Sequence, residues 1–136
     1  MANSVRDWMS SPVVLIAPET TITQALTLMR RRGIHSLVVD LTKGGDPTYG
    51  IVTTTDIRDK IVAESMDPSA MTVDQIMTSP VVCARSDWNL RQAAQKMGEL
   101  GAHHLPVEDE RGSLIGMISA TDIFIAVEER GWEASL

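Results

Sequence analysis

The chain lacks several features that would narrow its class at once. Its 136 residues include a single cysteine, Cys83, which excludes an internal disulfide. Lys and Arg number 12 against 18 Asp and Glu, whereas a nucleic-acid-binding surface needs a clustered excess of cations. No apolar run approaches the roughly 18 residues of a membrane span, and the first ten residues lack the apolar core of a signal peptide. We therefore expect a cytoplasmic protein with no membrane insertion and no nucleic-acid partner.

What the chain does contain is enough apolar material for a folded core. Apolar residues make up 43% of the sequence and charged residues 22%, so burial can offset the entropy of folding. The one dense basic run, residues 30–32, is typical of a solvated helix end, where cations complement the helix dipole. Cys83 lies in the apolar run 80–83, which predicts a buried strand and a structural cysteine.

The sequence repeats itself. A shift of 68 positions aligns residues 5–40 with residues 73–108 at 13 identities. After a deletion of two residues, residues 50–57 align with residues 116–123. The deletion falls in a polar turn, where changes of length are tolerated. The chain is therefore predicted to contain two copies of one unit.

Both copies predict the same order of elements. Ile22, Ala25 and Met29 keep the spacing of an amphipathic helix, and Gly33 follows where a left-handed terminating residue is favoured. The expected elements are a capped turn ending at Met9 or Met77, a strand over 12–15 or 80–83, the amphipathic helix ending before Gly33 or Gly101, two strands over 36–39 and 49–52 or 104–107 and 114–118, and a closing helix from Thr54 or Ala120.

This order predicts an α/β fold built from a tandem pair of βαββα units. About 60 residues bury a core poorly alone, so we expect the two units to pack sheet to sheet with pseudo-two-fold symmetry. The predicted boundaries are 1–66 for the first unit, 67–72 for a linker, 73–129 for the second unit and 130–136 for a tail that includes Trp132.

At this point the chain resembles the cystathionine-beta-synthase (CBS) domain pair, also called a Bateman module. Four features match in order in both copies, which makes the resemblance much more specific than any one of them. They are Met-x-Ser-Pro-Val-Val at 9–14 and 77–82, the Ala and Met of the helix at 25 and 29 or 93 and 97, Gly-x-His-x-Leu-x-Val from 33 or 101, and Gly followed by two apolar residues and Ser/Thr-x-x-Asp from 50 or 116.

The resemblance implies a non-catalytic regulatory module that binds an adenosine-containing ligand in the cleft between the copies and signals by a change of shape. AMP, ADP, ATP, NAD and S-adenosylmethionine are the candidate regulatory ligands, and no cofactor is required. We expect a homodimer acting on an unknown downstream protein, because the closing helices present Ile57, Ile61, Ile123 and Val127. The alternative is a dimerisation or interaction module without a ligand.

The polar candidate residues lie where a strand meets the closing helix. Carboxylates can accept hydrogen bonds from both ribose hydroxyls, while hydroxyls and helix-start amides can donate to phosphate. The same residues also fit helix capping alone, because Ser or Thr three residues before an acid is a common start of a helix. In the family the matching Asp holds the ribose and the hydroxyls line a phosphate site. The candidates are Thr53, Thr55, Asp56, Ser119, Thr121 and Asp122.

Two further sets complete the predicted site. His35 and His103 occupy equivalent positions after the helix-ending glycines, and the matching histidine faces phosphates in nucleotide-binding members of the family. Imidazole also suits this task because its charge is adjustable near neutral pH. An apolar slot for adenine is predicted from strand residues that equally fit the core. These residues are Val13, Val14, Ile34, Val81, Val82 and Ala102.

Catalytic motifs are missing from the sequence. It contains no Gly-rich phosphate loop, no His-Glu-x-x-His, no paired cysteines and no Gly-x-Ser-x-Gly. Adjacent histidines such as His103 and His104 point to opposite faces of a strand, so no metal site is predicted. We therefore do not expect an enzyme.

Overall fold

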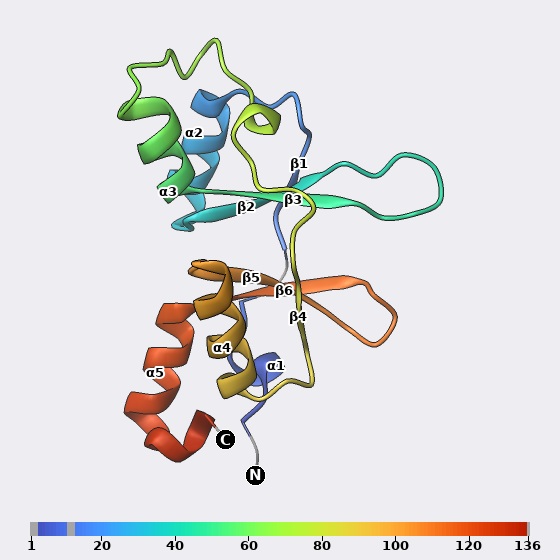
Figure 1. Ribbon diagram of the computed structural model, residues 1–136, viewed down its shortest axis with the longest axis vertical. Coiled ribbons are helices and arrows are strands. Elements are labelled where there is room, and N and C mark those ends of the chain that lie inside the picture. The colour runs from blue at the N-terminus through green and yellow to red at the C-terminus, as the bar shows by residue number, and fades with distance from the viewer. Residues whose placement is uncertain (1–2, 11–12, 136) are drawn as a thin grey trace. The chain divides into compact units, whose positions relative to one another are not determined.

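A computed structural model describes residues 3–10 and 13–135, and the chain forms two compact units (Figure 1). Residues Val14–Val81 form the unit that we call the β1–β3 unit after its sheet. Residues Met1–Val13 and Val82–Leu136 form the β4–β6 unit. Each unit joins one three-stranded sheet to helices, so the predicted α/β class is confirmed.

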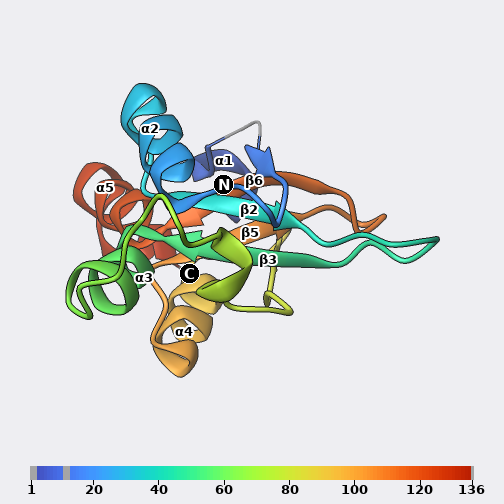
Figure 2. The same cartoon turned by 90° about the horizontal axis from the view of Figure 1, so that it is seen from above.

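The β1–β3 unit has a parallel and an antiparallel strand pair. β2 lies in the centre of the sheet, parallel to β1 and antiparallel to β3, with Ser36 opposite Thr53. The loop of the β2–β3 hairpin extends away from α2 and α3 (Figure 1 and Figure 2). Its elements are β1 (Leu15–Ile16), α2 (Ile22–Arg32), β2 (Ser36–Asp40), β3 (Tyr49–Thr53), α3 (Thr54–Ile57), the π-helical turn Arg58–Val62 and the 3-10 turn Val73–Gln75.

The β4–β6 unit repeats this arrangement. β5 lies between the parallel β4 and the antiparallel β6, with His104 opposite Ser119. The βαββα order predicted for both copies is therefore present. The elements are α1 (Val5–Trp8), β4 (Ala84–Arg85), α4 (Leu90–Leu100), β5 (His104–Glu108), β6 (Leu114–Ser119), α5 (Ala120–Arg130) and the 3-10 turn Trp132–Ser135, which contains the tail residue Trp132.

Local signals set both ends of α2 and α4, and the glycines that end them were predicted. Thr21 and Asn89 cap α2 and α4 by accepting a hydrogen bond from the backbone of the third helical residue. Gly33 and Gly101 end these helices with φ of 63° in both cases, a left-handed conformation in which a Cβ would be strained. None of the helices in the described residues is long and apolar enough to cross a membrane.

The two cores are built from corresponding residues. In the β1–β3 unit Ile22, Leu37 and Val52 are fully buried, and in the β4–β6 unit Leu90, Leu105 and Ile118 occupy the equivalent places. Burial of such apolar side chains contributes about 1.5–3 kcal/mol each. Each sheet therefore has its own core, with the helices packed on it.

The opening segments of the copies are exchanged between the units. Val5 is fully buried in the core of the β4–β6 unit and donates its N–H to the carbonyl of Trp88 over 2.8 Å. Val73 is fully buried in the core of the β1–β3 unit and donates to the carbonyl of Thr20 over 2.9 Å. The boundaries of the compact units thus differ from those of the sequence copies. The boundaries 1–66, 67–72 and 73–129 describe the copies and stay a prediction.

The prediction for the first strand of each copy is wrong by a few residues. β1 begins at Leu15 and β4 at Ala84, later than the predicted runs 12–15 and 80–83, and Pro12 lies outside the described residues. The Val81 N–H instead donates to the carbonyl of Tyr49 over 3.0 Å. This N–H is therefore taken by the start of β3, and ladder pairing with β5 begins only at Ala84.

Candidate functional site

In the β1–β3 unit a capping box fixes the junction between β3 and α3. The Thr53 N–H donates to Oδ2 of Asp56 over 2.9 Å, and the Asp56 N–H donates to Oγ1 of Thr53 over 3.3 Å. The next residue, Thr54, donates its N–H to the carbonyl of His35 over 3.0 Å. The structure therefore brings His35 next to the Thr53–Asp56 segment, from which it is distant in the sequence.

The junction of β6 and α5 in the other unit has the same geometry. The Ser119 N–H donates to Oδ2 of Asp122 over 2.8 Å, and the Asp122 N–H donates to Oγ of Ser119 over 3.2 Å. Ala120 donates its N–H to the carbonyl of His103 over 2.9 Å. Equivalent residues predicted from the sequence thus meet in the same way within each unit.

Several of these groups are accessible to solvent. His35, His103, Thr55 and Thr121 are exposed, and the side chain of Asp56 is 16% exposed. An ionised carboxylate has about four lone-pair sites, so capping leaves acceptor capacity on it. Each junction therefore carries a partly exposed carboxylate and an exposed hydroxyl on the segment that bonds to the backbone of an exposed histidine.

The two junctions differ at one cation, which the sequence analysis missed. Nζ of Lys60 lies 3.3 Å from Oδ1 of Asp56 and donates a hydrogen bond to the carbonyl of Ile76 over 2.8 Å. Ala126 occupies the corresponding place four residues after Asp122 and is fully buried. The Asp-x-x-x-Lys spacing on one helix was the available signal, because residues four apart are neighbours on a helix.

The predicted apolar residues divide between the two units. Val14 and Ile34 are half-buried against the core of the β1–β3 unit. In the β4–β6 unit Ala102 is half-buried, whereas Val82 is 42% exposed. The remaining two, Val13 and Val81, are half-buried. A role in holding an adenine ring stays a prediction for all six.

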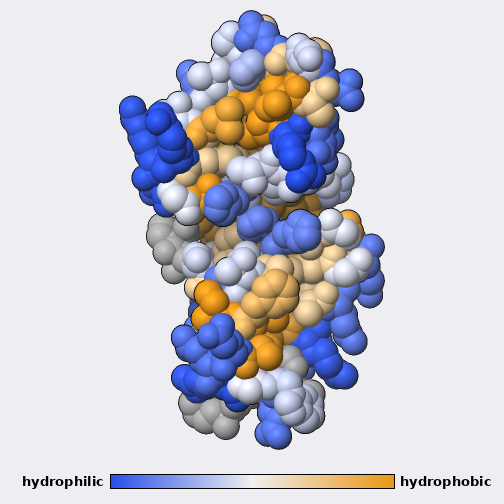
Figure 3. Space-filling model, turned by 90° about the vertical axis from the view of Figure 1, so that its left-hand side faces the viewer, coloured by the Kyte–Doolittle hydropathy of each residue, from blue (hydrophilic) through white to orange (hydrophobic). Residues whose placement is uncertain are grey.

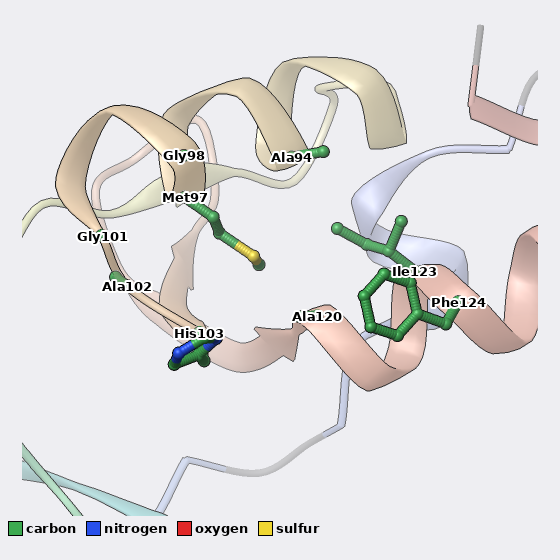
Figure 4. Close-up of a pocket in the computed structure, with 9 residues that line it drawn as sticks. All are labelled: Ala94, Met97, Gly98, Gly101, Ala102, His103, Ala120, Ile123 and Phe124. Carbon is green, nitrogen blue, oxygen red and sulfur yellow. The ribbon is translucent and has the colours of Figure 1, made fainter. Parts of the chain in front are cut away.

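An apolar pocket of about 440 Å³ lies between α4 and α5 of the β4–β6 unit. Met97 enters it from α4, and Ile123 and Phe124 from α5 (Figure 4). Two predicted site residues, Ala102 and His103, lie at its edge. The sequence analysis missed this pocket, for which the one phenylalanine of the chain was the available signal.

The prediction about exposed faces of the closing helices is wrong. Ile57, Ile61 and Ile123 are 3%, 1% and 6% exposed, and Val127 is half-buried against the core. The helix is turned so that the neighbouring residue Phe124 is 68% exposed. The reason is helical phase, since each residue advances about 100° around the helix axis. The copies differ at this outward position, where Phe124 aligns with Arg58.

Cys83 is half-buried just before β4. Burial, and secondarily the charge of Glu108, raises the pKa of its thiol to about 11. Because the thiolate is the reactive form, we expect alkylation by iodoacetamide at pH 8 to be about a hundredfold slower than for an ordinary exposed thiol. The rate can be followed by mass spectrometry of the intact chain. The same protein in urea serves as the control, and equal rates in both conditions would contradict the shielding.

The two units and their matching junctions define a duplicated α/β module. The sequence model of the CBS domain family matches residues 5–63 and 73–129 of this chain. The chain therefore belongs to the CBS domain family, as the motifs indicated.

Comparisons with individual proteins agree with this assignment. An uncharacterized protein of Methanopyrus kandleri is 32% identical over 111 residues, and the match spans 82% of this chain and 56% of that protein. The chain thus spans about half the length of this curated relative. The structure of a hexameric CBS-CP12 protein from bloom-forming cyanobacteria is 31% identical with a TM-score of 0.85, covering 91% of this chain and 67% of the other.

A further structure bears on ligands. It is the CBS domain pair of protein MJ0100 in complex with 5'-methylthioadenosine and S-adenosyl-L-methionine, 25% identical with a TM-score of 0.81. The match covers 96% of this chain and 99% of the other. The CBS domain pair is a regulatory module and not a catalytic one, so the prediction that this chain is not an enzyme is confirmed.

Proposed function

We propose that the chain binds an adenosine-containing small molecule at its strand-to-helix junctions and that occupancy regulates a partner protein. The observation that carries the proposal is the repeated junction itself. Asp56 lies in a capping box beside the backbone of His35, and Asp122 lies in the same arrangement beside His103. A structure needed only for capping does not require an exposed histidine at this place in both copies.

The chemistry of the junction suits a nucleoside. The carboxylates of Asp56 and Asp122 accept hydrogen bonds from the two adjacent ribose hydroxyls. The exposed hydroxyls of Thr55 and Thr121 donate to phosphate or to other polar groups on C5' of the ribose. Apolar contact for the base comes from the half-buried residues Val13, Val14, Val81, Ile34 and Ala102.

The identity of the ligand is open within this class. AMP, ADP, ATP, NAD and S-adenosylmethionine all contain the adenosine moiety that the junctions are proposed to recognise. Support for the adenosyl part comes from the MJ0100 pair, whose structure contains 5'-methylthioadenosine and S-adenosylmethionine. Occupancy changes the module only to the extent that the ligand prefers one conformation over another.

A thermal-shift panel tests the proposal. The five candidate ligands and 5'-methylthioadenosine are each added at millimolar concentration, with inorganic phosphate and guanosine monophosphate as controls. We expect at least one adenosyl ligand to raise the Tm by several degrees, because a ligand that binds only the folded state stabilises it by about 2.7 kcal/mol at a hundred times its Kd. A panel without any shift, followed by calorimetry without heat, would favour the ligand-free interaction module.

Self-association is the second part of the proposed function, with a second copy of this chain as the occupant of the pocket between α4 and α5. Phe124 is 68% exposed and its neighbour Ile125 is 42% exposed. Apolar side chains are visible over the helices of the β4–β6 unit in the lower half of Figure 3. The similar CBS-CP12 protein is hexameric, which supports a homo-oligomer here.

A charged substitution in the pocket tests this interface. We expect Phe124→Lys to lower the mass measured by light scattering at micromolar concentration from that of a dimer or larger assembly to that of one chain. Met66→Lys is the matched control, because Met66 is 43% exposed and lies outside the pocket. A wild-type chain that is monomeric, or a Phe124→Lys variant of unchanged mass, would contradict the proposed interface.

A further inference from the structure

We infer that Lys60 makes the two nucleoside sites unequal, so that ligand fills the Asp122 site before the Asp56 site. The inference rests on the proposed function, because it concerns how strongly each junction binds the same ligand. It assigns a role to a residue that lies outside the repeated motifs and that has no charged counterpart in the second copy.

Lys60 engages the oxygen of Asp56 that the capping box leaves free. Oδ2 of Asp56 already accepts hydrogen bonds from the N–H and the hydroxyl of Thr53, at 2.9 and 3.2 Å. Oδ1 faces the Lys60 ammonium group at 3.3 Å. Both carboxylate oxygens therefore have partners, and a ribose hydroxyl has to compete with a cation for Oδ1.

The lysine is held in place from its other side. Its ammonium group donates to the carbonyl of Ile76 over 2.8 Å, and Ile76 itself is 4% exposed. The ammonium group thus bridges the Asp56 carboxylate and the backbone of the buried Ile76 in the same unit. A lysine with two partners loses more interaction free energy when it releases Asp56 than a lysine whose ammonium group is mobile in solvent.

The backbone of the closing helix also differs between the copies at this residue. After α3 the chain continues as a π-helical turn over Arg58–Val62, with a hydrogen bond of 2.9 Å from the Ala63 N–H to the carbonyl of Arg58. Lys60 lies in the middle of this wider turn. The equivalent α5 is a regular α-helix over Ala120–Arg130, and π-turns inside helices are frequent at functional sites.

In the second copy nothing equivalent to Lys60 is encoded. Ala126 stands at that place, fully buried, and Oδ2 of Asp122 accepts the Ser119 N–H over 2.8 Å. A ribose therefore meets a carboxylate without a lysine four residues further along the helix. The expected difference in affinity is about three- to fivefold, the size typical of a partly exposed ion pair.

Site-resolved titration with AMP tests the order of filling. Backbone amide shifts of residues 53–55 and 119–121 are followed by NMR as AMP is added to the full chain. We expect residues 119–121 to reach their midpoint at an AMP concentration about three- to fivefold lower. In Lys60→Met, which keeps the aliphatic stem and removes the charge, the two midpoints move together. Lys60→Arg keeps the difference between the midpoints, and high salt narrows that difference in the wild type and in Lys60→Arg.

Lys96→Met is the matched control, because Lys96 pairs with Glu99 over 2.9 Å on α4 and its loss changes the net charge by the same amount. Equal midpoints in the wild type overturn the inference even if Lys60→Met does not fold. It is also overturned if Lys60→Met leaves the ratio of the two AMP midpoints unchanged. Weaker binding at residues 53–55 in Lys60→Met would overturn it too, because the lysine would then contact the phosphate. AMP and the other panel ligands moving neither set of amides would instead refute the proposed function.

Discussion

Replacing Gly116 by alanine is expected to lower the free energy of unfolding by about 3 kcal/mol, the range of overpacking at a site that cannot relax. A Cβ at this position would lie 2.6 Å from Sδ of Met9 and 2.7 Å from the carbonyl oxygen of Ser10. Ser10 cannot move away easily, because it exchanges two backbone hydrogen bonds of 2.9 Å with Met117. Urea unfolding followed by circular dichroism measures the loss.

Two other glycines calibrate this result. Gly50 is the equivalent residue in the first copy, but a Cβ there would meet Sδ of Met77 at 2.7 Å and the carbonyl of Thr78 only at 3.1 Å. Because a methionine side chain is flexible, we expect Gly50→Ala to cost less. Gly98 on α4 has no atom within 4 Å of a Cβ, so Gly98→Ala should stabilise by about 0.5–1 kcal/mol. A Gly116→Ala variant as stable as Gly98→Ala would show that the opening segment does not pack as described.

The packing of the opening segments shows one limit of the sequence analysis. The repeat identified Met9 and Met77 as equivalent, and periodicity and turn residues placed the helices and the central strands. Neither shows which copy of the sheet an opening segment joins. Val5 and Val73 are both apolar and both preceded by a capping residue, so their local signals are identical whether they pack on their own copy or on the other one.

The outward faces of the closing helices show a second limit. The sequence analysis predicts that Ile57, Ile61 and Ile123 are exposed, yet they are buried in the cores of their units. A run such as Ile123–Val127 is apolar on nearly every side, so its periodicity does not say which side faces the core. Tertiary packing decides the phase and leaves Phe124 outside.

The junctions were more predictable than either of these features, for a physical reason. Capping boxes are local, and Ser or Thr three residues before Asp fixes the start of a helix without long-range contacts. Both predicted boxes are present, at Thr53 and Ser119. The carbonyls of His35 and His103 bond to the first helical residue just beyond the strand pairs Ser36–Thr53 and His104–Ser119, a contact that was not predicted. Lys60 was missed because its second partner, the carbonyl of Ile76, lies in a segment expected to belong to the other unit.

Removing the carboxylate charge at both junctions is expected to abolish binding of the adenosyl ligand. We expect Asp122→Asn to weaken affinity by about 10- to 100-fold, since hydrogen bonds to charged groups contribute about 1.5–3 kcal/mol. Asparagine keeps an acceptor for the Ser119 N–H, so the cap and the fold should survive. Asp122→Ala also loses the hydrogen bond that the Ser119 N–H donates to the carboxylate, at a further cost of about 1 kcal/mol in stability. The double variant with Asp56→Asn should show no heat of binding by calorimetry.

The control has to separate ribose recognition from a general effect of charge. Glu110→Gln removes one negative charge at an exposed position of the β5–β6 hairpin and should bind as the wild type does. Comparison of adenosine with 2'-deoxyadenosine gives a second check, because a carboxylate that accepts both ribose hydroxyls should prefer adenosine. In Asp122→Asn the amide shifts of residues 119–121 should lose this preference, while those of residues 53–55 keep it. Wild-type affinity in the double variant would mean that Asp56 and Asp122 only cap their helices, since a capping role alone predicts a change in Tm and none in ligand affinity.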